Sequence, residues 1–119
     1  MRKVFIVDDH VFMRETLGAL IDAEDGLACC GYAGSIAETM AALPDDVVLV
    51  LIDLSLGGDS GLDLVRRLRA ERPALHLLVL SAQSAADYRA IAIEAGADGF
   101  VEKGNVEEML ATIHRTLDT

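Results

Sequence analysis

Short, unbroken runs of apolar residues alternate along the chain with longer stretches in which apolar residues recur every three or four positions. The clearest run, 47–54, consists of branched apolar residues and carries one acid, Asp53, near its end. Turn-forming residues lie on both sides of it, at 44–46 and 57–59. A short branched apolar run bounded by turns predicts a strand that is buried on both faces. Such a strand implies a parallel sheet that is covered by helices on each side.

The same alternation extends over the whole chain. Further strands are predicted at 4–7, 27–33 and 75–80 and around 100–101, and a helical period follows each strand: from about 13, over 36–43, around 64–69, over 84–95 and over 106–117. Strands that are joined through helices must run parallel, and their crossovers should be right-handed. A chain of 119 residues fits one domain. The sequence therefore predicts a single α/β domain of five strand–helix repeats.

Several helix ends are marked by capping residues. Ser35 followed by Glu38 is a capping box, and Asn105 precedes the last helix in the same way. Gly26 and Gly96 are predicted to close the first and fourth helices at their C-termini.

Composition narrows the class of partner. Asp and Glu number 20 against 10 Lys and Arg, for a net charge of −10, and 52% of residues are hydrophobic. An acidic surface argues against direct nucleic-acid binding by this chain, because phosphate contacts need clustered cations. No apolar run reaches membrane-spanning length, and the run after Arg2-Lys3 stops too early for a secretory signal. We therefore expect a cytoplasmic protein without membrane contact, in which the adjacent Cys29 and Cys30 stay reduced.

The candidate chemistry lies where the predicted strands end. Asp8-Asp9, Asp53, Ser81 and Lys103 each follow or close an apolar run. Ligands of such sheets bind at the carboxyl ends of the strands, so these side chains are expected to meet. Neighbouring carboxylates repel one another unless a divalent cation lies among them, and all-oxygen ligands suit Mg²⁺. A lysine and a hydroxyl beside that cation suggest a phosphoryl guest, which an aspartate carboxylate can attack to form an acyl phosphate.

These positions resemble the receiver domain of two-component response regulators, over the whole chain, 1–119. The residues that carry the resemblance are Asp8-Asp9-His10, Asp53, Gly61, Ser81-Ala82, the segment Gly96-Ala97-Asp98-Gly99-Phe100 and Lys103. The resemblance implies a flavodoxin-like, doubly wound (βα)5 fold whose five-stranded parallel sheet has the order 2-1-3-4-5. The segment 99–105 looks most like the branch whose receivers precede a LuxR-type helix-turn-helix domain, which these 119 residues do not contain.

The family implies a role for each position. Asp53 would accept a phosphoryl group from a sensor histidine kinase or a phosphotransfer protein, and Lys103 would pair with that group. Mg²⁺ would be held by Asp9, by Asp53, by the backbone carbonyl of Ser55 and, through water, by Asp8. Ser81 would move toward the phosphoryl group, and Phe100 would change rotamer with it. Dimerisation and transcriptional output would follow, with no enzymatic activity beyond slow self-dephosphorylation.

Two departures from the family pattern affect the loops beside the site. Gly57 stands where the family often has proline, so the loop 56–59 is expected to be more mobile. Gly104 stands where a proline often follows the lysine. A cis Lys-Pro bond is then impossible, and a cis Lys-Gly bond would cost about 3 kcal/mol.

Two other classes of function compete with this interpretation. A phosphatase of the haloacid-dehalogenase type needs a second acid two residues after its nucleophile, and that position here is Ser55. A stand-alone, non-phosphorylated interaction module on the same fold would have a vestigial pocket and would fail to bind Mg²⁺. The alternative for Phe100 is a fixed core residue that does not switch, and His10 is expected to be a neutral histidine at the rim of the pocket.

Overall fold

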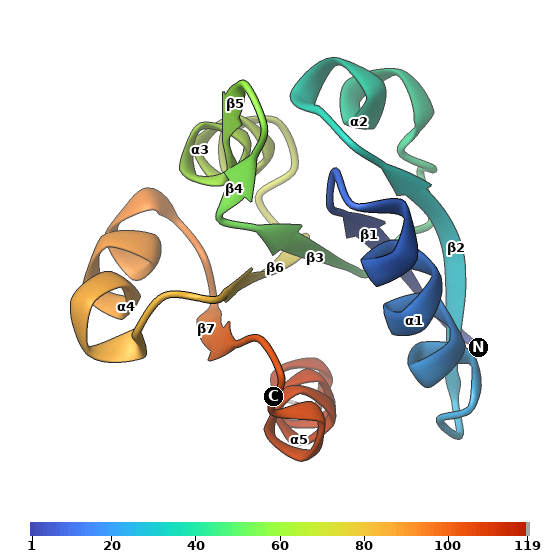
Figure 1. Ribbon diagram of the computed structural model, residues 1–119. Helices are drawn as coiled ribbons and strands as arrows, with labels where there is room; N and C mark the ends of the chain where they lie inside the picture. Colours follow the sequence, from blue (N-terminus) through green and yellow to red (C-terminus); the bar gives the residue numbers. More distant parts are fainter. Residues whose placement is uncertain (119) are drawn as a thin grey trace.

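The computed structural model describes residues 1–118, which form a five-stranded parallel sheet between two layers of helices (Figure 1). The sheet order is β2-β1-β3-β6-β7. Its strands are β1 (Arg2–Val7), β2 (Leu27–Ala33), β3 (Leu49–Asp53), β6 (His76–Ser81) and β7 (Gly99–Glu102). When the two short strands β4 (Ser55–Leu56) and β5 (Asp59–Ser60) are left out of the numbering, this is the predicted order 2-1-3-4-5, and the predicted fold class is confirmed.

Helices cover both faces of the sheet. On one face lie α1 (Val11–Asp22) and α5 (Val106–Leu117), and on the other lie α2 (Ile36–Ala42), α3 (Gly61–Glu71) and α4 (Ala85–Ala95) (Figure 1). Every residue of β3 is buried. Leu49 and Leu51 pack toward α1 and α5, whereas Val50 and Ile52 pack toward the other three helices. The central strand is therefore buried on both faces, as its composition predicts, although it begins at Leu49 rather than at Val47.

Two of the predicted N-terminal caps form as expected. The Ser35 hydroxyl accepts a hydrogen bond from the Glu38 N–H at 3.1 Å, and the Glu38 carboxylate accepts one from the Gly34 N–H at 3.1 Å. The Asn105 side chain accepts a hydrogen bond from the Glu108 N–H at 3.1 Å. These bonds satisfy N–H groups that have no partner within the helix.

The predicted role of Gly26 as a helix cap is wrong. Helix α1 ends at Asp22, and the chain reaches β2 through two further turns, in which Glu24 donates to the Ile21 carbonyl and Leu27 donates to the Glu24 carbonyl. Gly26 has φ +83° in the second of these turns. A glycine serves a left-handed turn position as readily as a helix end, so its presence alone did not distinguish the two.

A small hairpin after Asp53 was not predicted. β4 (Ser55–Leu56) pairs antiparallel with β5 (Asp59–Ser60) across Gly57 and Gly58, and Gly57 has φ +61°. A proline cannot adopt that conformation, so the glycine permits this turn. The greater mobility expected for 56–59 stays a prediction.

Strand β2 lies at the edge of the sheet. Its pairing register with β1 shifts between Val4 and Phe5, opposite the two cysteines. Cys29 and Cys30 are both free and pack against opposite faces of the sheet. Among residues 1–118, no helix has both the length and the apolar character that crossing a bilayer requires.

Candidate functional site

The carboxyl ends of four strands bring the candidate residues to one edge of the sheet. Lys103, just after β7, places its Nζ 2.8 Å from Asp53 Oδ2 and 3.0 Å from Asp8 Oδ2. Asp8 is 1% exposed and Asp53 is 5% exposed. Three ionisable groups that lie far apart in the sequence thus form a buried bridge, in which one ammonium group contacts two carboxylates.

Each of these side chains is oriented by the backbone that follows its strand. Asp8 Oδ1 accepts the His10 N–H at 2.9 Å, Asp53 Oδ1 accepts the Ser55 N–H at 3.1 Å, and Ser81 Oγ accepts the Gln83 N–H at 2.9 Å. A short polar side chain that bonds to the N–H two residues on stabilises a turn at that point. The same local hydrogen bond therefore follows β1, β3 and β6, and it orients Asp8, Asp53 and Ser81 at the common edge of the sheet.

The buried bridge shifts the protonation of its members. Burial raises the pKa of the Asp53 carboxyl, and the hydrogen bonds from Lys103 and from the Ser55 N–H offset only part of that effect. For Asp8, burial acts in the same direction, but hydrogen bonds from the His10 N–H and from Lys103 outweigh it and lower the pKa. Burial would lower the pKa of the Lys103 ammonium, yet its bonds to Asp53 and Asp8 raise it above the usual range. Lys103 therefore remains charged at neutral pH.

Asp9 and His10 complete the open side of the site. Ligand atoms of Asp8, Asp9, His10 and Asp53 all lie within 4.8 Å of one another. Carboxylate oxygens gathered at that spacing suit a hard divalent cation, because they need a shared positive charge beyond the one that Lys103 supplies. The residues present therefore fit the Mg²⁺ that the family resemblance implies. The predicted role of the Ser55 carbonyl as a further ligand stays a prediction.

The two predicted switch residues occupy different positions. Ser81 lies at the site and is 2% exposed. Its hydroxyl accepts the Gln83 N–H, and its backbone carbonyl accepts the Lys103 N–H at 2.7 Å. Phe100 is buried on β7, within the core between the sheet and the helices α2, α3 and α4. Movement of either residue stays a prediction, and so does the alternative that Phe100 is fixed.

The substitution of glycine for proline at position 104 leaves the lysine in contact with both acids. All peptide bonds within residues 1–118 are trans, and Gly104 has φ +94°. Lys103 reaches Asp53 and Asp8 from this left-handed turn, which proline could not form. Sequence reasoning placed His10 at the rim of the pocket, but it did not predict that the ring would contact both Asp8 and Asp9. The spacing Asp8-Asp9-His10 was visible, but a strand end does not by itself indicate which way the next ring turns.

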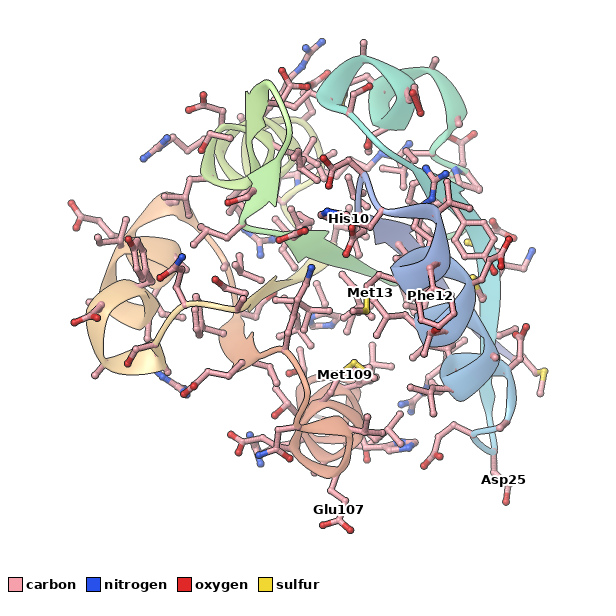
Figure 2. All side chains as sticks on the ribbon, in the orientation of Figure 1. His10, Phe12, Met13, Asp25, Glu107 and Met109 are labelled. Carbon is pink, nitrogen blue, oxygen red and sulfur yellow. The ribbon has the colours of Figure 1, made fainter. Side chains whose placement is uncertain are left out.

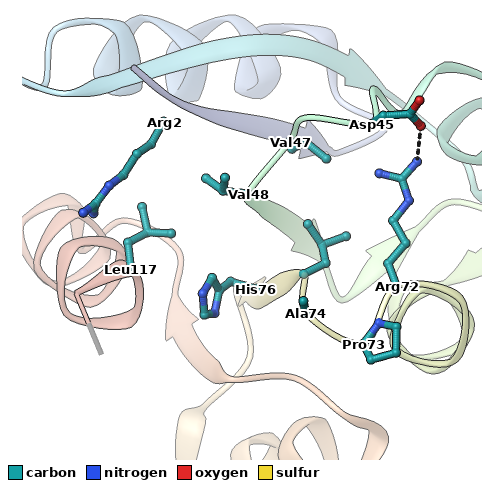
Figure 3. Close-up of a pocket in the computed structure, with 10 residues that line it drawn as sticks. Arg2, Asp45, Val47, Val48, Arg72, Pro73, Ala74, His76 and Leu117 are labelled. Carbon is teal, nitrogen blue, oxygen red and sulfur yellow. Dashed lines mark ion pairs between the residues drawn. The ribbon is translucent and has the colours of Figure 1, made fainter.

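A second pocket, of about 480 Å³, lies at the opposite end of the sheet (Figure 3). Its lining includes Arg2 and Arg72, but Arg2 pairs with Asp118 at 2.9 Å, and Arg72 donates to the Pro44 carbonyl at 2.7 Å and lies 3.7 Å from Asp45. Its cations are therefore already engaged, and the pocket brings together no group of candidate catalytic residues.

The comparisons with known proteins identify the class. The family model "Response regulator receiver domain" matches residues 4–114, so this chain belongs to the family of response regulator receiver domains. It is 40% identical over 106 residues to the DNA-binding transcriptional activator DevR/DosR of Mycobacterium tuberculosis, an alignment that covers 87% of this chain and 48% of the relative. The chain spans about half the length of the curated relatives it matches.

Two solved structures of response regulators are similar to this chain over most of its length. It is similar to a two-component response regulator of the LuxR family from Aurantimonas sp. SI85-9A1, with 29% identity and a TM-score of 0.86 over 98% of this chain and 84% of that one. It is also similar to a response regulator from Burkholderia pseudomallei whose structure contains a phosphorylated aspartic acid, a calcium ion and citrate, with 29% identity and a TM-score of 0.80 over 93% and 65% of the two chains. The resemblance to the LuxR-type branch that the segment 99–105 predicted is thus confirmed.

Gly61, the first residue of α3, packs directly behind Asp53. A Cβ atom added at Gly61 would lie 2.1 Å from the Asp53 carbonyl oxygen and 2.9 Å from Leu54 Cα. Because both are backbone atoms, Gly61→Ala is expected to displace the strand end and to lower the free energy of unfolding by about 2 kcal/mol. Gly58→Ala, where the added Cβ meets nothing within 4 Å, is the matched control. Urea denaturation of both variants measures the difference; equal midpoints would contradict the close packing.

Proposed function

We propose that this chain is a phosphorylation-controlled receiver, in which Asp53 accepts a phosphoryl group from a sensor histidine kinase or a phosphotransfer protein. The observation that carries the proposal is the contact of Lys103 Nζ with both Asp53 and Asp8 at the carboxyl edge of the sheet. A carboxylate held beside a fixed ammonium group, with further acids at the open side, suits attack on phosphorus and stabilisation of the charge that results.

The transfer balances as a simple displacement. An Asp53 carboxylate oxygen forms a bond to the phosphorus of a phosphohistidine, and the phosphorus–nitrogen bond of the donor breaks. The electron pair stays on the donor imidazole, which then takes a proton. Lys103 would neutralise part of the new negative charge, and the Ser81 hydroxyl, at the end of the neighbouring strand, would donate to a phosphoryl oxygen. Bound Mg²⁺, held by Asp9, Asp53 and the Ser55 carbonyl, with Asp8 acting through water, would supply the remaining charge compensation.

The acyl phosphate is proposed to act as a switch. It carries about two negative charges in place of the single charge of the Asp53 carboxylate, and it shifts the equilibrium between two states only by the difference in its contacts with them. Ser81 and Phe100 are the residues proposed to differ between those states. The consequence would be dimerisation or transcriptional regulation through a helix-turn-helix domain outside these 119 residues. The acidic composition, with a net charge of −10, supports an output that does not involve direct nucleic-acid contact by this chain.

The rest of the assignment follows from the same proposal. Residues 1–119 would act as one receiver domain in the cytoplasm, with no turnover beyond slow self-dephosphorylation. Ser55, at the position where a phosphatase of related chemistry needs an acid, supports the absence of turnover.

The test is phosphorylation by a small-molecule phosphodonor in the presence of Mg²⁺, followed by intact-protein mass spectrometry. The wild type is expected to gain one phosphoryl group, and Asp53→Asn is expected to gain none. Asp63→Asn, an exposed acid on α3 that pairs with Arg66, serves as a control and should behave as the wild type. Equal labelling of Asp53→Asn would contradict the assignment of the acceptor. An unlabelled wild type that also fails to bind Mg²⁺ would favour the non-phosphorylated interaction module instead.

A further inference from the structure

His10 contacts the acidic pair through its ring. His10 Nδ1 lies 3.1 Å from Asp8 Oδ1 and 3.1 Å from Asp9 Oδ1, while 71% of its side chain is exposed. Figure 2 labels the residue between the end of β1 and the start of α1, at the carboxyl edge of the sheet. The ring therefore lies against the same carboxylates that would hold a cation, and the phosphoryl transfer described above leaves it without a role.

A single hydrogen bond accounts for only one of the two contacts of the ring. One ring nitrogen carries at most one proton, so Nδ1 can donate fully to only one of the two carboxylate oxygens. Asp8 does not depend on the ring, because its Oδ1 already accepts the His10 N–H at 2.9 Å and its Oδ2 accepts Lys103. In the other tautomer the proton lies on Nε2, so Nδ1 carries a lone pair. That lone pair then faces the lone pairs of Asp8 Oδ1 and Asp9 Oδ1. Such an arrangement is favourable when a cation lies between them.

The spacing of the donors fits that arrangement. In an octahedral site with metal–ligand bonds of about 2.1 Å, adjacent ligand atoms are about 3.0 Å apart. The distance from His10 Nδ1 to Asp9 Oδ1 is 3.1 Å, and the ligand atoms of the whole group lie within 4.8 Å of one another. The imidazole nitrogen therefore lies at the distance from Asp9 Oδ1 that two adjacent ligands of one cation would have.

We propose that His10 is a nitrogen ligand of the divalent cation in this pocket and that it shifts the preference of the site from Mg²⁺ toward Mn²⁺ and Co²⁺. Imidazole binds the later divalent metals better than it binds Mg²⁺, which takes oxygen ligands and water almost exclusively. The inference rests on the part of the proposed function that gives this pocket a divalent cation; it does not depend on phosphoryl transfer.

The first measurement is pulsed electron paramagnetic resonance on the 119-residue protein loaded with Mn²⁺ alone. A coordinated imidazole produces nitrogen modulation of the Mn²⁺ signal, which is expected in the wild type and absent in His10→Leu. His10→Gln, which keeps hydrogen-bonding capacity toward the carboxylates, is also expected to lose it. His76→Leu is the matched control and should retain it, because His76 begins β6 at the other end of the sheet and lies 3.8 Å from Asp98.

The second measurement is calorimetric titration of the same proteins with Mn²⁺, Co²⁺ and Mg²⁺ separately. His10→Leu is expected to lower the affinity for Mn²⁺ by at least about tenfold, since loss of even an indirect partner of a metal site costs that much. The affinity for Mg²⁺ is expected to fall less, so the ratio of Mn²⁺ affinity to Mg²⁺ affinity should fall. Nitrogen modulation that is missing from the wild type, or that persists in His10→Leu, would overturn the proposal, and so would an unchanged affinity ratio.

The two proposals fail separately. If Asp53 takes up no phosphoryl group but nitrogen modulation is lost in His10→Leu, the role of His10 stands and the receiver function falls. If Asp53 is labelled and Mn²⁺ binds without any nitrogen signal, the receiver function stands and the role of His10 falls.

Discussion

Lys103→Met is expected to lower the free energy of unfolding at neutral pH, in the absence of divalent cations, by about 3 kcal/mol. Lys103 is the cation that contacts both Asp8 and Asp53, and the side chains of the two acids are 1% and 7% exposed. Removing it leaves two buried carboxylates close together, and the folded variant is then stabilised when either carboxylate binds a proton. The native variant binds more protons than its unfolded state, so its stability should fall as pH rises and recover as pH is lowered.

Chemical denaturation at several pH values, with excess chelator, measures this effect. Lys3→Met is the matched control, because Lys3 pairs with Asp46 at the surface, where an ion pair contributes at most about 1 kcal/mol. Similar losses in the two variants would show that the contacts of Lys103 add nothing to folding beyond those of an exposed pair. Phosphodonor labelling of Lys103→Met should also slow, because the ammonium group no longer compensates the charge of the phosphoryl group.

Asp53→Asn is expected to remove most of the stabilisation that Mg²⁺ gives to the folded protein. A cation that binds only the native state, at one hundred times its dissociation constant, adds about 2.7 kcal/mol in the wild type. The asparagine keeps the size of the side chain and can still accept the Ser55 N–H, but it loses the charge that attracts the cation. Thermal unfolding with and without Mg²⁺ measures the difference, and Asp63→Asn should respond as the wild type does. An unchanged Mg²⁺ response in Asp53→Asn would remove Asp53 from the predicted ligand set.

Without Mg²⁺, the same variant is expected to be at least as stable as the wild type at neutral pH. Burial raises the pKa of Asp53 above its ordinary value of 3.8, so the native protein holds this proton more tightly than the unfolded chain does. Stability of the wild type therefore falls as pH rises from about 4 through the raised pKa, and the asparagine removes that loss. The advantage of Asp53→Asn should grow across this window and then level off. Denaturation midpoints that favour the wild type throughout would contradict the direction of the shift.

The parts of this molecule that follow from local physics were predictable from sequence. The central strand was identified from its unbroken apolar run, and the caps at Ser35 and Asn105 from residue types at a fixed spacing. The shared edge occupied by Asp8, Asp53 and Lys103 followed from parallel strands ending on one side. These features depend on periodicity and topology, which a single sequence carries.

The features that escaped prediction depend on how the chain turns between elements. The hairpin of β4 and β5 involves only four paired residues, too few to give a period, and it is held in place by contacts such as the bond from the Ile36 N–H to Asp59 at 2.9 Å. Gly26 fits a helix cap and a left-handed turn equally well. The His10 ring contacts two acids on the preceding turn, and no pattern of residue types predicts that orientation.

The hydrogen bond between the Lys103 N–H and the Ser81 carbonyl connects the two sides of the site through the main chain. Helix α5 begins three residues after that lysine, at Val106, a residue that is 38% exposed. A displacement at the end of β6 would therefore reach the first turn of α5 through this hydrogen bond and the main chain of residues 103–106. The outer surface of α5 is thereby linked through the main chain to the buried carboxylates at the edge of the sheet.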